Sequence, residues 1–239
     1  YSVPLPDSTQ PLRAIIDSYT KQHSAEYQAQ ALIDIGFALH ARGLDLDSVT
    51  DVLIRTSHHT HHVIGTGSND PQKMDPDSSR ETLDHSVMYI LAVAWEDGAW
   101  HHVDSYTSER THRPSTVSVW QKIRTEEAPE WTQAYHATDF RNKKFGAEVV
   151  VTLKNGDQVI EALDNPNAHS LGASPFARAD YIGKLRTMGE GVADPDEMDR
   201  FIGLVENLER LSADDIARLN IVVPSDRLQD ASAERVGIL

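Results

Sequence analysis

The feature that most constrains the fold is a pair of β-branched runs that meet at an Asn-Gly dipeptide. Within residues 147–163, Val149-Val-Val-Thr-Leu153 and Val159-Ile160 flank Asn155-Gly156. Asn-Gly between two such runs predicts a β-hairpin with a type I′ turn. A second alternation of β-branched residues at 48–57 predicts another strand of the same sheet. We therefore expect a small mixed or antiparallel sheet of three or four strands.

Helical patterns surround these strands. Apolar residues recur at steps of three and four over 24–42, where Gly43 ends the pattern, and over 83–96, which Asp97-Gly98 ends. Pro114 precedes a third expected helix at 115–124. After Pro166 three more helices are expected, at 176–188, 196–211 and 213–219. The pattern predicts an α+β fold.

The change of character near Pro166 predicts the domain organisation. Residues 1–12 contain three prolines and predict an extended lead-in. Residues 13–165 form the expected α+β domain, and 170–239 form a helical segment. This segment needs a partner on which to bury its apolar stripes.

Charge and composition exclude several classes of function. The 239 residues hold 37 Asp and Glu against 22 Lys and Arg, for a formal charge of −15. This field repels phosphate polymers and anionic membranes, so we expect neither nucleic acid nor membrane as a partner. No cysteine is present, which excludes disulfides, thiolate zinc sites and iron–sulfur clusters. The first residues lack an initiator Met and a signal-peptide pattern, as expected for a segment from within a longer protein.

Histidine is over-represented, and its densest group is the run Ser57-His-His-Thr-His-His62. As the end of a strand, this run would place His59 and His61 on one face. Imidazoles are common ligands of zinc, copper and nickel, so a metal site is one interpretation. The other is that these histidines bond only to backbone and neighbouring groups.

Two further residues are candidates for acid–base chemistry. His85 lies near the start of a predicted helix, where it can act as a general acid or base or serve as a capping or core residue. Lys21 precedes the first predicted helix, where it can meet an anionic substrate or be ordinary solvated surface. The spacing alone leaves both choices open.

Three segments carry a resemblance to a known family. They are 19–30 (YTKQHSAEYQAQ), 57–85 (SHHTHHVIGTGSNDPQKMDPDSSRETLDH) and 97–106 (DGAWHHVDSY). Together they resemble the MmgE/PrpD family, from about residue 12 to the end of the chain. The likeness covers only the C-terminal half of the family's chain. It implies that 13–165 is an α+β lid domain and that the last helices belong to an all-helical domain mostly missing here.

The resemblance also implies a reaction and a set of site residues. The expected reaction eliminates water from 2-methylcitrate to give 2-methyl-aconitate in propionate breakdown, the methylcitrate cycle, without a cofactor or a metal. Lys21 and His85 are then the expected catalytic residues, and Arg80 and Lys73 the expected ligands of a small tricarboxylate substrate. A cytoplasmic homodimer is expected, and the chain alone is expected to be incomplete and inactive because the N-terminal half is missing.

Other activities remain open. Relatives in this family decarboxylate cis-aconitate or epimerise iminodisuccinate, so the fold alone does not fix the substrate. A non-catalytic, His-rich metal-binding fragment is a further alternative, supported only by the histidine run at 58–62.

Overall fold

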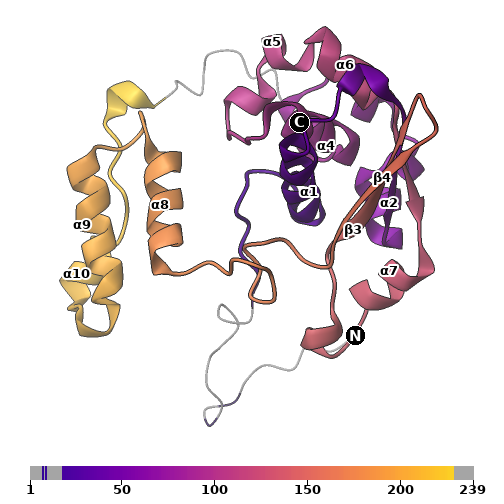
Figure 1. Cartoon of the computed structure of the whole chain (residues 1–239). Helices are drawn as coiled ribbons and strands as arrows, with labels where there is room; N and C mark the ends of the chain where they lie inside the picture. The colour runs from indigo at the N-terminus through magenta and orange to yellow at the C-terminus, as the bar shows by residue number, and fades with distance from the viewer. Residues whose placement is uncertain (1–6, 8, 10–17, 229–239) are drawn as a thin grey trace. The chain divides into compact units, whose positions relative to one another are not determined.

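The structure, a computed structural model, describes residues 7, 9 and 18–228 and confirms the α+β fold class (Figure 1). The chain divides into two compact units, Tyr1–Pro175 and Phe176–Leu239. The lead-in predicted for 1–12 lies outside the described residues apart from Asp7 and Thr9. Among the described residues, no helix is both long and apolar enough to cross a membrane.

A four-stranded mixed sheet forms the centre of the first unit. Its strands are β1 (Val49–Thr56), β2 (Ile123–Glu127), β3 (Ala147–Leu153) and β4 (Gln158–Leu163). Their order is β2-β1-β3-β4, with β1 parallel to β2 and the other pairs antiparallel. Alternate residues of β1 and β3 are buried, so one face of the sheet lies against the core.

Two helices pack together in this core, α1 (Gln30–Ala41) and α4 (Val87–Asp97) (Figure 1). Every residue from Val87 to Trp95 is buried, because α4 lies between α1, α6 and the sheet. The two helices approach closely at Gly36, where a Cβ atom would lie 2.7 Å from that of Ala94. Gly98 ends α4 in the left-handed region, with φ 62°, as the sequence predicted.

The remaining elements of this unit are short. They are η1 (Tyr27–Ala29), η2 (Leu46–Ser48), α2 (His58–Ile64), η3 (Thr66–Ser68), η4 (Pro71–Met74), α3 (Arg80–Asp84), η5 (Asp104–Tyr106), α5 (Ser108–Thr111), α6 (Pro114–Trp120), α7 (Pro129–Tyr135) and η6 (Phe140–Asn142).

The structure corrects the expected helix at 83–96. Two helices, α3 and α4, replace it, and the break falls at His85-Ser86. The Ser86 side chain accepts a hydrogen bond from the Tyr89 amide and so begins α4 as its N-cap. His85 is thus at the end of a short helix, outside the long one.

Two other local predictions were wrong. The expected helix at 115–124 ends at Trp120, and β2 follows, because Ile123 and Thr125 become buried when β2 pairs with β1. The histidine run belongs to α2, not to a strand, because Ser57 caps a helix there by accepting a hydrogen bond from the Thr60 amide. His58 and His62 therefore share a helix face.

The β3–β4 hairpin is confirmed, but its turn differs from the prediction. A type I′ turn needs positive φ at both central residues, whereas here Gly156 has φ 87° and Asn155 does not adopt positive φ. The Gly156 amide donates to the Leu153 carbonyl at 2.9 Å, and Leu153 pairs again with Asp157. The left-handed residue is thus accommodated as a glycine bulge.

The second unit is helical, as predicted. It contains α8 (Arg178–Gly189), α9 (Pro195–Glu206), η7 (Leu208–Arg210), α10 (Ala213–Ala217) and η8 (Ser225–Arg227). Of its described hydrophobic residues, only Ala193 and Met198 are buried. A groove of about 780 Å³ between α8 and α9 is lined mainly by apolar side chains, among them Tyr181, Leu185 and Phe201.

Candidate active site

The segment that precedes η1 is fastened to the junction of α3 and α4. The Glu26 amide donates to the Asp84 carbonyl at 3.2 Å. The Tyr106 hydroxyl lies 2.7 Å from the Ser24 carbonyl and 3.0 Å from Asp84 Oδ1, so it joins the same two segments. These contacts place Ser24 and Glu26 next to Asp84, which lies about 60 positions later in the sequence.

Glu26, which lies at this junction, has a carboxyl group with a shifted pKa. Burial raises the pKa of its carboxyl group, while hydrogen bonds from the Gln28 and Tyr27 amides lower it. The charges of Lys21 and His85 also lower this pKa. Lys21 and His85, which the sequence singled out separately, thus both influence the ionisation of one half-buried carboxyl group. A carboxyl group with a shifted pKa next to cationic groups is typical of acid–base sites.

One ring nitrogen of His85, Nε2, can accept a proton. Its Nδ1 lies 3.0 Å from the Glu81 carbonyl oxygen, which can only accept a hydrogen bond, so Nδ1 carries the proton in this contact. In the neutral imidazole, Nε2 then has a free lone pair. The side chain is 49% exposed, so this nitrogen is accessible to a substrate.

Arg80 lies over the ring of Tyr106. Its guanidinium is 4.9 Å from the centre of the Tyr106 ring, and Nη2 donates to the His102 carbonyl at 3.1 Å. Burial raises the pKa of the Tyr106 phenol most strongly, and the charge of Asp84 raises it further. The phenol therefore stays protonated and can donate its hydrogen bond. Arg80 is exposed and retains further donors for an anion.

Lys73 is buried, whereas Arg80 is exposed. Lys73 places its Nζ 3.4 Å from Asp70 Oδ2. Its carbonyl oxygen accepts from Ser86 Oγ at 2.7 Å and from Trp120 Nε1 at 3.2 Å. These contacts fasten the 65–79 loop to the core and pair the Lys73 ammonium with Asp70.

Three buried polar atoms in the same segment have no hydrogen-bond partner: His23 Nε2, Ser24 Oγ and Tyr27 OH. Buried polar groups are nearly always bonded, so three within five residues mark an unusual site. His23 Nε2 lies 3.8 Å from Asp34 Oδ1, beyond hydrogen-bond distance. From the sequence, Ser24 was expected to cap the first helix and Glu26 to lie in its first turn, and none of these residues was assigned a chemical role. In the structure Ala29, not Ser24, is the N-cap position of α1. The available signal was the dense polar run Lys21–Glu26, directly before an apolar helix.

Fold and site together describe an α+β domain in which the Glu26 segment is joined to the junction that carries His85. A family model described as the MmgE/PrpD C-terminal domain matches residues 23–210, and the chain belongs to the MmgE/PrpD family. This membership supports, at the coarse level of enzyme class, an enzyme of the lyase type. The match includes His85, Arg80 and Lys73, whereas Lys21 lies two residues before it.

Proposed function

We propose that this chain provides the lid side of the active site of a 2-methylcitrate dehydratase, which eliminates water to give 2-methyl-aconitate in propionate catabolism. The observation that carries the proposal is the hydrogen-bonded junction of residues 24–26 with Asp84, where the charges of Lys21 and His85 lower the pKa of the half-buried Glu26 carboxyl group. Family membership supports the reaction class. The high sequence specificity of the 57–85 block favours this substrate within the family.

The chemistry of the elimination matches these groups. One group takes the proton next to a carboxylate, and the C–O bond breaks as a second group protonates the departing hydroxyl, which leaves as water. In the proposal, His85 Nε2 is one proton-transfer site. Lys21 is the second proton carrier or binds a substrate carboxylate. The Glu26 carboxylate stabilises the Lys21 ammonium, and it stabilises the imidazolium that forms when His85 Nε2 takes a proton.

The three carboxylates of the substrate need cations around them. Arg80 is free to supply two donors to one carboxylate. Lys73 can contribute only if the substrate replaces Asp70 as its partner, because this ion pair now occupies its ammonium. The elimination needs proton transfer and charge stabilisation alone, so we propose no cofactor and no catalytic metal.

The proposal includes a missing helical half of the same protein, with cytoplasmic location and homodimeric assembly. The apolar groove between α8 and α9 supports the missing half, since stable helices bury such surfaces. Val205, Leu208 and Ile216 are each about half exposed in this unit. We propose that helices of the other half cover them, and that the 239-residue chain alone is inactive.

A substrate comparison tests the proposal. The natural protein that contains this sequence is incubated with 2-methylcitrate, cis-aconitate or iminodisuccinate, and products are identified by mass spectrometry. Conjugated 2-methyl-aconitate is also followed by ultraviolet absorbance. We expect kcat/KM to be highest for 2-methylcitrate dehydration. Faster decarboxylation of cis-aconitate or faster epimerisation of iminodisuccinate would contradict the proposed substrate and leave the family assignment unchanged.

A further inference from the structure

The four histidines of α2 fall into two pairs with different surroundings. His61 is half-buried, and its Nδ1 lies 2.7 Å from Thr125 Oγ1. The His59 ring stacks on Tyr135, with 5.5 Å between ring centres and 10° between ring planes. These two histidines are engaged in packing. His58 and His62 remain, one helical turn apart on an exposed face.

Glu127, the last residue of β2, completes a group with His58 and His62. His58 Nδ1 lies 2.8 Å from Glu127 Oε2, and the two imidazole ring centres are 4.3 Å apart. One ligand atom from each of the three residues lies within 4.8 Å of the other two. Ligands of a tetrahedral Zn²⁺, each about 2.0–2.1 Å from the ion, are about 3.3 Å apart. The three ligand atoms must therefore move closer together to bind one ion.

Neighbouring groups already orient these side chains. His62 Nδ1 lies 3.2 Å from the Gly67 carbonyl, which fixes its proton there and leaves Nε2 as a ligand. Thr132 Oγ1 donates to Glu127 Oε1 at 2.8 Å and accepts from the His58 amide at 2.8 Å. Such outer contacts are typical of histidine and carboxylate ligands in metal sites.

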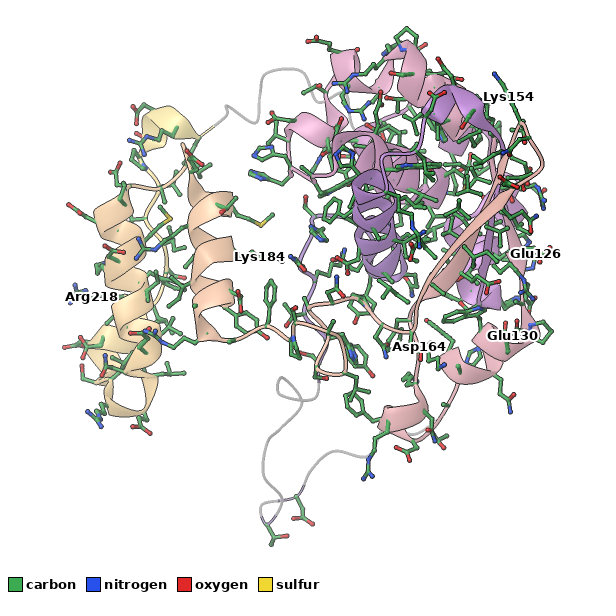
Figure 2. All side chains as sticks on the ribbon, in the orientation of Figure 1. Glu126, Glu130, Lys154, Asp164, Lys184 and Arg218 are labelled. Carbon is green, nitrogen blue, oxygen red and sulfur yellow. The ribbon has the colours of Figure 1, made fainter. Side chains whose placement is uncertain are left out.

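The other carboxylates near this group have a different partner. Arg55 bonds to Glu126 at 3.2 Å and to Glu130 at 3.1 Å, and both glutamates are labelled in Figure 2. Glu127, in contrast, bonds to the imidazole of His58 and the hydroxyl of Thr132, and no ion pair with Lys or Arg is found for it among the described residues. Its charge is thus available to a cation, and the −15 charge of the chain favours cation binding.

We propose that His58, His62 and Glu127 form a surface binding site for a divalent transition metal ion, with Zn²⁺ as the best fit. Two imidazoles and one carboxylate are a donor set that zinc accepts, and water completes the coordination. The ion would fasten α2 to the end of β2. This site shares no residue with the candidate active site, and the inference does not rest on the proposed reaction.

Isothermal titration of the 239-residue chain with ZnCl₂ tests the site. We expect one strong site per chain. His62→Asn and Glu127→Gln should each weaken zinc binding by at least about tenfold, which is about 1.4 kcal/mol. His101→Asn is the matched control. The His101 side chain is 44% exposed, adjoins another histidine and lies 3.3 Å from the carboxylate of Asp104. This control should bind zinc like the unchanged chain.

Thermal unfolding gives a second readout. Saturating zinc should raise the Tm of the unchanged chain and of His101→Asn, and raise it less in His62→Asn and Glu127→Gln. His62 and Glu127 are exposed and His101 is partly exposed, so circular dichroism should show the same fold in every variant. Equal zinc affinity in the unchanged chain and both ligand variants, or an equal loss in His101→Asn, would overturn the proposal.

Discussion

At the scale of single residues, the candidate site depends on a carboxyl group that the sequence did not single out. Lys21 and His85 could be nominated from residue type and position, because a cation and an imidazole near helix starts are chemically conspicuous. Glu26 could not be nominated in this way, because what sets it apart is its partial burial and the effect of Lys21 and His85 on its pKa. Burial of a polar residue outside regular structure depends on tertiary contacts, here the bonds of its segment to Asp84 and Tyr106.

The raised pKa of Glu26 predicts a pH dependence of stability. Burial makes the folded chain hold this proton more tightly than the unfolded chain, whose carboxyl has a pKa near 4.5. The stabilising contribution is therefore complete below pH 4.5 and is lost as pH rises through the higher folded pKa. Glu26→Gln, which is always neutral, should gain stability relative to the unchanged chain between pH 4 and pH 7.

Urea unfolding at several pH values checks this prediction. Glu190→Gln is the control, because Glu190 is exposed on the helical unit. Its difference from the unchanged chain should be constant with pH. A constant difference for Glu26→Gln as well would show that burial does not control the ionisation of Glu26.

At the scale of elements, periodicity predicted most helices and the hairpin but not every boundary. The break at His85-Ser86 was missed because apolar residues continue across it, and only the Ser86 cap separates α3 from α4. Strand β2 was missed because Ile123-Arg-Thr-Glu-Glu127 holds a single large apolar residue. Its strand conformation comes from parallel pairing with β1, a contact remote in sequence. Local pattern cannot contain that information.

The α1–α4 contact gives a prediction at this scale. Gly36→Ala should destabilise the first unit by about 1–3 kcal/mol, because the added Cβ would lie 2.7 Å from the Ala94 Cβ and 3.0 Å from the Trp95 amide nitrogen. All four tryptophans lie in this unit, so their fluorescence follows its unfolding.

Gly203→Ala in α9 is the contrasting variant. Its added Cβ would meet no atom within 4 Å, so the higher helix propensity of Ala should stabilise α9 by about 0.5–1 kcal/mol. Circular dichroism during urea unfolding measures that change. Equal effects of the two substitutions would contradict the close packing of α1 on α4.

At the scale of the whole molecule, the two units differ in how much apolar surface they bury. The first unit holds a continuous core from α1 through α4 to the sheet, whereas the second buries almost no large side chain. The helix pattern of residues 170–239 predicted that this segment must bury apolar stripes against a partner. It could not show which faces stay exposed, because that depends on how α8, α9 and α10 pack together.

Hydrogen exchange can measure this difference. In the 239-residue chain, the backbone amides of α9 should exchange at least about a hundredfold faster than those of α4, since few buried contacts oppose local opening. In the natural protein that includes the proposed helical half, α9 should become protected while α4 changes little. Strong protection of α9 in the 239-residue chain would contradict the need for a covering partner.

In the proposed dehydratase, Lys21 and His85 act together at the Glu26 carboxyl group. The most direct test is the rate of 2-methylcitrate dehydration by the natural protein carrying Lys21→Ala or His85→Ala. Lys154→Ala, at the exposed hairpin tip in Figure 2, and His136→Ala are the matched controls. We predict that kcat/KM falls by about 10²–10⁴-fold for Lys21→Ala and at least about tenfold for His85→Ala, with both controls unchanged. Rates for Lys21→Ala and His85→Ala equal to those of the controls would contradict this account of the site.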